Sequence, residues 1–148
     1  EKTPKLYENM NVAAKSHVIP DLIRKIMYGS ETLELLGSGN QVRQYIHGND
    51  LAKGITLSLF NEKSINNDFN LTDEREVSVI ELAMILWRKI RKNENYKFKM
   101  INGYKYDCEK RTISARKAYE ILNFKTEVDF EDGLDEIISF FESENKQK

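Results

Sequence analysis

The chain has 148 residues, which fits one domain spanning 1–148, and its composition of 40% hydrophobic and 32% charged residues excludes a largely disordered protein. Its 23 basic and 24 acidic residues leave a net charge of −1, which gives no electrostatic footprint for nucleic acid or an anionic membrane. No apolar run approaches the ~20 residues of a membrane span, and the single cysteine, Cys108, suits a reducing compartment, so we expect a cytoplasmic protein.

The first half of the chain predicts two helices and three short strands. Apolar spacing indicates a helix over about 17–28, with Pro20 in its first turn and Gly29 as its stop. Asp50 is placed to cap the second helix, because an aspartate side chain can accept a bond from a free backbone N–H of the first turn. The expected positions of the remaining elements are strands at 33–36, 44–47 and 68–71 and a helix over about 51–61.

The second half carries the clearest helix start. Ser78 followed by Glu81 forms a capping box ahead of an apolar stripe that runs to residue 90. A strand is expected at 96–101. Two further helices are indicated by Ser114 as a cap with Asn123 as a left-handed stop, and by Asp129 at the start of the last apolar stripe.

Several familiar catalytic patterns are absent from the sequence. A dinucleotide-binding turn needs a third glycine three positions after Gly39, where Val42 stands, and the segment that follows reads as a strand. Tyr106 and Lys110 have the spacing of a reductase Tyr/Lys pair but lack a helical stripe, so we interpret the match as chance. The two histidines have no nearby ligand partners, which argues against a metal site.

Three segments carry a resemblance to a known family: residues 16–25 (SHVIPDLIRK), 36–52 (LGSGNQVRQYIHGNDLA) and 106–118 (YDCEKRTISARKA). Together they closely resemble the C-terminal half of the extended short-chain dehydrogenase/reductases, the NAD-dependent epimerase/dehydratases of nucleotide sugars. The resemblance runs from about residue 6 to residue 142, and the first segment is most similar to the family's GDP-sugar epimerase-reductases. Tyr7-Glu8-Asn9 departs from the usual Tyr-Gly-Pro turn, and Gly48-Asn49 departs from the usual Val-Asp.

The resemblance implies an α/β fold: a helix-rich mixed domain with short strands that forms the substrate-binding half of the enzyme, without the Rossmann domain. NAD or NADP would be bound by an N-terminal Rossmann domain of the same protein, and no cofactor by this chain alone. The expected ligand is a nucleotide diphosphate-sugar. Family members often dimerise, mainly through the Rossmann part, so a homo-oligomer is possible here and the oligomeric state stays open.

Arg43 is the first candidate for binding. It follows the turn at Gly37 and Gly39, where backbone can approach a ligand closely, and its planar guanidinium suits phosphate oxygens. By resemblance this position binds near the diphosphate, and Asp107 with Arg111 would lie around the ribose and phosphates. The alternatives are a surface arginine and an ordinary charge pair in a loop.

His17 is the single catalytic candidate. In some family members the histidine of this segment is assigned as an acid in epimerisation, which is chemically sensible because histidine exchanges protons near neutral pH. The alternative is a capping or polar-contact histidine.

Two other functions stay open. The chain could be a stand-alone nucleotide-sugar-binding module or an inactive interaction domain. If it is instead half of an enzyme, inactive by itself, the surface meant for the Rossmann part would be exposed and partly apolar, and we expect self-association.

Overall fold

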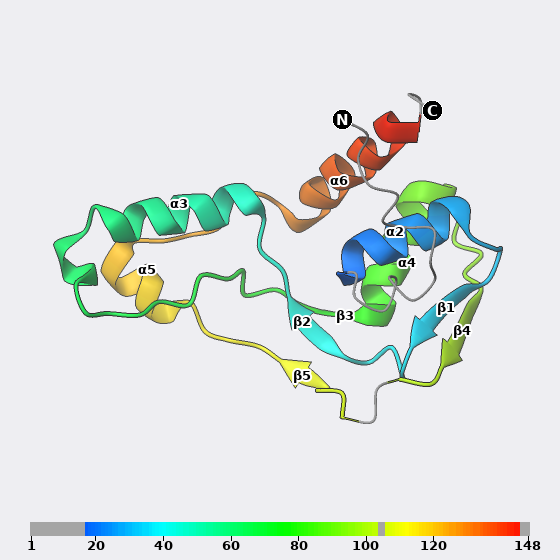
Figure 1. Cartoon of the computed structure of the whole chain (residues 1–148), viewed down its shortest axis with the longest axis horizontal. Helices are drawn as coiled ribbons and strands as arrows, with labels where there is room; N and C mark the ends of the chain where they lie inside the picture. The colour runs from blue at the N-terminus through cyan, green and yellow to red at the C-terminus, as the bar shows by residue number, and fades with distance from the viewer. Residues whose placement is uncertain (1–16, 104–105, 146–148) are drawn as a thin grey trace, which may run out of the picture.

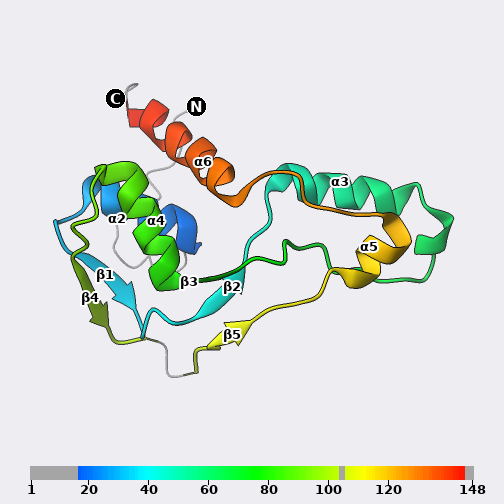
Figure 2. The ribbon, with the colours of Figure 1, turned by 180° about the vertical axis from the view of Figure 1, so that it is seen from behind.

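The computed structural model describes residues 17–103 and 106–145. In Figure 1 these residues form two unequal lobes, with most helices and strands at one end and two helices at the other. Figure 2 shows the same division from behind, with the two lobes connected by several extended segments. The fold is mixed α/β and rich in helices, as expected.

The larger lobe is built around three helices, α2 (Val18–Tyr28), α4 (Val79–Arg91) and α6 (Phe130–Asn145). Each turns one apolar stripe inward, because residues three and four apart share a helix face. The fully buried side chains of this core include Ile23, Ile26, Leu35, Val77, Leu82, Leu86 and Leu134.

Two small sheets flank these helices. One pairs β1 (Leu33–Leu36) with β4 (Phe98–Ile101) in parallel. The other has the order β3-β2-β5, in which β2 (Val42–Gln44) lies antiparallel to β3 (Glu76–Ser78) and parallel to β5 (Lys110–Arg111). The central position of β2 brings chain segments together that are more than thirty and more than sixty residues apart in the sequence.

The smaller lobe consists of α3 (Gly48–Leu59), a 3₁₀ turn (Glu62–Ser64) and α5 (Arg116–Leu122). Its own core has only three buried residues, Ala118, Leu122 and Phe124, with partly buried neighbours such as Leu71. A core of this size buries little apolar surface by itself, since a buried side chain contributes roughly 1.5–3 kcal/mol. The small lobe therefore depends on its attachment to the rest of the chain.

Most of the predicted helix starts and stops are confirmed. Ser78 Oγ accepts a hydrogen bond from the Glu81 backbone N–H at 3.2 Å, and Asp129 Oδ1 accepts from the Glu131 N–H at 2.8 Å. Asn123 ends α5 in the left-handed conformation. The strands at 33–36 and 96–101 are present, the second as Phe98–Ile101.

Helix α2 stops at Gly29 as expected. Four predictions need correction. Ser114 accepts a hydrogen bond from the Arg116 N–H, but Ala115 holds the N-cap position of α5 and makes no capping side-chain bond. The strand expected at 44–47 lies at Val42–Gln44, and the one expected at 68–71 is absent from the structure. Asp50 does not cap α3: His47 holds the cap position, and its Nδ1 accepts from the Asn49 N–H at 3.3 Å.

Asp50 instead lies within the first turn of α3 and is 3% exposed. Its two carboxylate oxygens accept hydrogen bonds from the backbone N–H groups of Glu127 and Val128, each at 3.1 Å. Because these residues lead into α6, Asp50 ties the small lobe to the large one. A carboxylate that satisfies two backbone donors at once explains why an acidic residue is buried here.

Tyr106 lies outside any helix and is 88% exposed, so the spacing to Lys110 has no helical basis. Tyr7-Glu8-Asn9 and Ser16 lie outside the described residues. In the described part of the chain, no helix is long and apolar enough to cross a bilayer.

Candidate functional site

A cleft of about 190 Å³ lies between helix α2 and strand β2 in the larger lobe. Its floor is apolar, with Val18, Leu22 and Leu35. Its charged border is formed by Asp21, Lys25, Glu34, Arg43 and Asp107. An apolar floor with a few convergent polar groups is the usual composition of a small-ligand site.

Arg43 projects into this cleft from the middle of β2. Tyr45, the residue directly after β2, also lines the cleft. The guanidinium Nη2 lies 3.4 Å from Asp107 Oδ1, and Nη1 donates to the carbonyl of Val42 at 2.8 Å. The side chain of Arg43 is 24% exposed, and these two contacts use only part of the five N–H donors of its guanidinium.

Asp107 reaches the cleft from the loop before β5. Its second oxygen, Oδ2, accepts a 2.8 Å hydrogen bond from the amide Nε2 of Gln41. The carboxylate therefore has Gln41 on one side and Arg43 on the other. Two predicted site residues, Arg43 and Asp107, are thus brought together, and Gln41 joins them.

Gly37 and Gly39 form the turn before β2, with φ of +75° and +77°. Both values lie in the left-handed region that glycine tolerates without strain. A Cβ on Gly37 would lie 2.3 Å from the Gln41 amide nitrogen, so this glycine makes room for the glutamine. Neither glycine is among the residues that line the cleft, and their visible role is to shape its wall.

Arg111 is placed differently from Arg43. The two residues are register partners on parallel strands, which puts their side chains on the same side of the sheet. Arg111 does not line the cleft, however, and its neighbour there is Arg43 rather than Asp107. The carboxylate of Asp107 faces Arg43, and the place expected for Asp107 and Arg111 around the ribose and phosphates of a ligand stays a prediction.

Lys25 is a cleft residue that the sequence analysis did not single out. It lies on α2, one turn after Asp21, and its ammonium group is 2.7 Å from that carboxylate. The available signal was the i,i+4 spacing of opposite charges on a predicted helix. That spacing is typical of solvated helix faces, so it did not distinguish a cleft residue.

His17 holds the N-cap position of α2, directly before the cleft residue Val18. Its side chain forms no cap hydrogen bond. His17 is not among the residues that line the cleft, and its place at the entry to α2 puts it beside the cleft rather than inside it.

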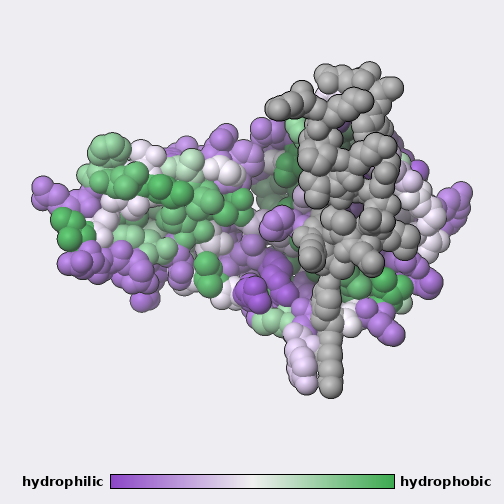
Figure 3. All heavy atoms as spheres, viewed as in Figure 1, coloured by the Kyte–Doolittle hydropathy of each residue, from purple (hydrophilic) through white to green (hydrophobic). Residues whose placement is uncertain are grey.

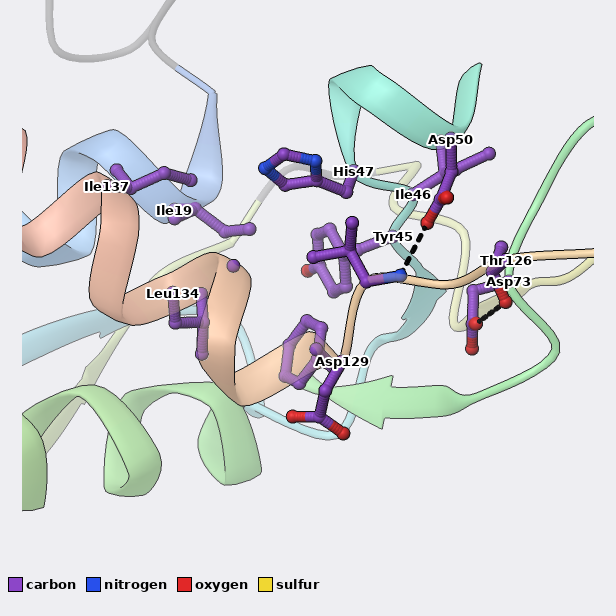
Figure 4. Close-up of a pocket in the computed structure, with 13 residues that line it drawn as sticks. Ile19, Tyr45, Ile46, His47, Asp50, Asp73, Thr126, Asp129, Leu134 and Ile137 are labelled. Carbon is purple, nitrogen blue, oxygen red and sulfur yellow. Dashed lines mark hydrogen bonds between the residues drawn. The ribbon is translucent and has the colours of Figure 1, made fainter. Parts of the chain in front are cut away.

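A second, smaller pocket of about 60 Å³ lies on the other side of Tyr45, and Figure 4 shows it between α6 and the start of α3. Its lining is mostly apolar and includes no Arg or Lys, so it offers no cation for a phosphate. Burial of the Tyr45 phenol raises its pKa, and the nearby Arg43 opposes this effect. The Tyr45 hydroxyl is buried and has no hydrogen-bond partner in the described part of the chain.

The charged lining of the cleft combines two cations, Lys25 and Arg43, with three carboxylates, those of Asp21, Glu34 and Asp107. Lys25 and Arg43 supply two cations, and each already faces a carboxylate. Its described lining contains no serine, cysteine or histidine that could act as a nucleophile or a near-neutral base. Among the described residues, no group of three or more His, Cys, Asp or Glu is arranged to bind a metal ion.

Comparison with known proteins relates residues 7–72 to the family described as the NAD dependent epimerase/dehydratase family. The chain is 28% identical over 127 residues to UDP-glucuronic acid decarboxylase 1 of Danio rerio, covering 86% of this chain and 29% of that protein. It is 30% identical over 114 residues to GDP-L-fucose synthase of Dictyostelium discoideum, covering 74% of this chain and 33% of that protein. The chain thus spans about a third of the length of these relatives.

Solved structures share the fold. An epimerase from Methanothermobacter thermautotrophicus superimposes with a TM-score of 0.77 at 23% identity, covering 89% of this chain and 38% of that one. UDP-glucuronic acid 4-epimerase from Bacillus cereus, solved in complex with UDP-glucuronic acid and NAD, gives a TM-score of 0.77 at 19% identity. That match covers 86% of this chain and 40% of the epimerase.

Proposed function

We propose that this chain is the nucleotide-sugar-binding portion of an NAD(P)-dependent nucleotide-sugar epimerase, dehydratase or reductase. The observation that carries the proposal is the partly exposed Arg43 in the cleft between α2 and β2, whose guanidinium has more N–H donors than its two contacts use. The match to the epimerase/dehydratase family and the relatives that carry nucleotide-sugar names support it.

In this proposal Arg43 grips the diphosphate and Lys25 adds a second positive charge from α2. Arg43 presents a planar fork that can meet two phosphate oxygens at once, whereas Lys25 acts as a point charge. Both cations must exchange at least part of their carboxylate contacts for the ligand. Arg111 lies next to Arg43 in the sheet register and extends the basic edge along β5.

The finer part of the proposal concerns His17. The segment His17-Val-Ile-Pro20 favours a GDP-sugar epimerase-reductase, and the similarity to GDP-L-fucose synthase supports this choice. Inversion of a carbon beside a ketone needs a proton removed from one face and returned to the other. His17, at the entry to α2, would supply one of these protons, and its partner would come from outside this chain.

The described residues do not fit a dinucleotide cofactor. The turn at Gly37 and Gly39 leads into strand β2, so no helix N-terminus faces it to receive a pyrophosphate. We therefore assign NAD or NADP to a separate Rossmann domain of the same protein. Under this proposal the chain is inactive by itself.

The outer face of α3 supports a partner domain. Leu51, Ile55 and Leu59 are spaced by four, so they share one face of the helix, and all are exposed. Figure 3 shows apolar side chains gathered at this end of the molecule, where Phe60 is 86% and Ile65 is 71% exposed. A contiguous apolar face of this kind marks an interaction surface, and the Rossmann domain is the partner we propose for it.

The segment just after this helix adds to the argument. Residues 68–71 carry the sequence pattern of a strand, yet in the described structure their backbone pairs with no other strand. A strand-like segment whose backbone N–H and C=O groups are unpaired can form hydrogen bonds with the edge of another sheet. A partner α/β domain could accept both this segment and the apolar face of α3.

The test is calorimetric titration of the chain with GDP, UDP, CDP and dTDP. Saturable binding of one diphosphate is expected, weakened at least tenfold by Arg43→Ala, because a bond between charged partners is worth roughly 1.5–3 kcal/mol. Arg116→Ala is the matched control, since this arginine lies on α5 outside the cleft and its side chain is 81% exposed. Equal effects of the two substitutions would contradict the assignment of Arg43.

A further inference from the structure

We infer that Gln41 is a positioning residue. It keeps Asp107 from contacting the guanidinium of Arg43 with both carboxylate oxygens, and so keeps Arg43 available to a diphosphate. The inference rests on the proposed function of the cleft. Neither the sequence patterns nor the comparisons assign a role to Gln41. It lies in the wall of the cleft, two residues before Arg43 on the same segment.

The side-chain amide of Gln41 has a fixed orientation. Gln41 is 7% exposed, and its Nε2 donates to Asp107 Oδ2 at 2.8 Å and to the carbonyl of Leu36 at 3.3 Å. Both partners are acceptors, so only the nitrogen can face them. The amide therefore holds one carboxylate oxygen of Asp107 in a defined place.

This arrangement limits what Asp107 can do to Arg43. Only Oδ1 faces the guanidinium, at a long distance of 3.4 Å, while Oδ2 is engaged by Gln41. Without the amide, the carboxylate could turn both oxygens onto the guanidinium in a bidentate pair, which is the strong form of this interaction. An incoming diphosphate would then have to displace a much stronger competitor.

Stability does not explain the presence of a glutamine at this position. Its Oε1 is buried and has no hydrogen-bond partner among the described residues, and a buried acceptor left unpaired is destabilising. The side chain of Asp107 is 33% exposed, so water could replace the amide of Gln41 at this carboxylate. A methionine has nearly the same shape and no polar atoms to satisfy, so it would fill this place at lower cost in folding.

The experiment is a double-mutant cycle on the affinity for the diphosphate identified by titration. Gln41→Met is expected to weaken binding about tenfold in the otherwise unchanged chain, but less than about twofold when Asp107→Asn is also present. The midpoint of thermal unfolding should not fall in Gln41→Met. Gln44→Met is the matched control, because it removes a glutamine from the other face of β2, where it accepts from the Ile113 N–H.

Three outcomes would overturn the inference: unchanged affinity in Gln41→Met, an equal loss of affinity with and without Asp107→Asn, or a loss that simply follows a lower unfolding midpoint. Failure of the unaltered chain to bind any of the four diphosphates would instead contradict the proposed function. A ligand-independent measurement separates the two cases. The Gln41 side-chain amide resonances should shift in Asp107→Asn, and unshifted resonances would contradict the contact on which the inference depends.

Discussion

Tyr45 shows at the scale of one residue how burial and pH are linked. Its hydroxyl is buried without a partner in the described part of the chain, so Tyr45→Phe should leave the free energy of unfolding unchanged or raise it by up to about 1 kcal/mol. Urea unfolding near neutral pH measures this change. A loss of more than about 1 kcal/mol would show that the hydroxyl has a partner.

The same residue predicts an alkaline effect. Burial raises the pKa of the Tyr45 phenol, against the opposing influence of Arg43, so the folded chain keeps this proton after the unfolded chain has lost it. The stabilisation of the folded chain that comes from keeping this proton is fully present below the unfolded pKa of about 10. It is lost as pH rises above that value. The unaltered chain should therefore lose stability more steeply than Tyr45→Phe between about pH 9 and about pH 11, as measured by urea unfolding across that range. Parallel curves would contradict this expectation.

Asp50 is the residue that ties the two lobes. In Asp50→Asn, one of the two backbone donors of Glu127 and Val128 would meet an amide NH₂ group instead of an oxygen, which leaves it unsatisfied. We expect the free energy of unfolding to fall by roughly 1–3 kcal/mol. Asp68→Asn is the control, since this side chain is fully exposed and should change stability by less than about 0.5 kcal/mol.

At the scale of one element, α3 offers a matched pair of glycines. A Cβ on Gly54 would lie 2.8 Å from both Leu71 Cδ atoms and 3.0 Å from the Phe124 ring, whereas a Cβ on Gly48 would meet nothing within 4 Å. Gly54→Ala should therefore lower the free energy of unfolding by about 1–2 kcal/mol, because overpacking exceeds the gain in helix propensity. Gly48→Ala should be neutral or stabilising by about 0.5 kcal/mol. Chemical denaturation compares the two, and equal effects would contradict the packing described for the small core.

The helices could be predicted from the sequence because their signals are local. The cap at Ser78 and the stop at Asn123 depend on residues within one turn, and both are confirmed. Strands β3 and β5 were not predicted, because two or three residues become a strand only by pairing with β2. Asp50 was misread for a similar reason: its partners, Glu127 and Val128, lie nearly eighty residues away.

The residues of the candidate site also fall into those that the sequence could predict and those that it could not. Arg43 could be proposed from the resemblance and from the turn before it, and the structure places it in a cleft. Gln41 and Lys25 were missed, since their position depends on the approach of Asp107 and on the packing of α2 against the sheet. The residues next to Gln41 or Lys25 in the sequence contain no pattern that predicts these contacts between distant segments.

At the scale of the whole molecule, the apolar face of α3 predicts self-association of the isolated chain. Ile55 and Leu59 are exposed on that face. Replacing both with lysine should abolish concentration-dependent association in sedimentation velocity and leave the unfolding midpoint nearly unchanged. Phe140→Lys, which alters an exposed aromatic residue on α6 instead, is the control and should still associate.

A chain that sediments as a monomer at every concentration would contradict this prediction. It would also weaken the case for a partner domain at α3, because the exposed apolar side chains of this helix would then not drive association.

The packing of α6 against the first helices has a consequence for biosynthesis. Leu134, Ile138 and Phe141 complete the same core as Ile23 and Ile26, although more than a hundred residues separate the two groups. A growing polypeptide therefore cannot close this core until its last helix has been made. During most of translation the apolar side of α2 would stay uncovered, which makes the nascent chain a natural client for chaperones that shield such surfaces.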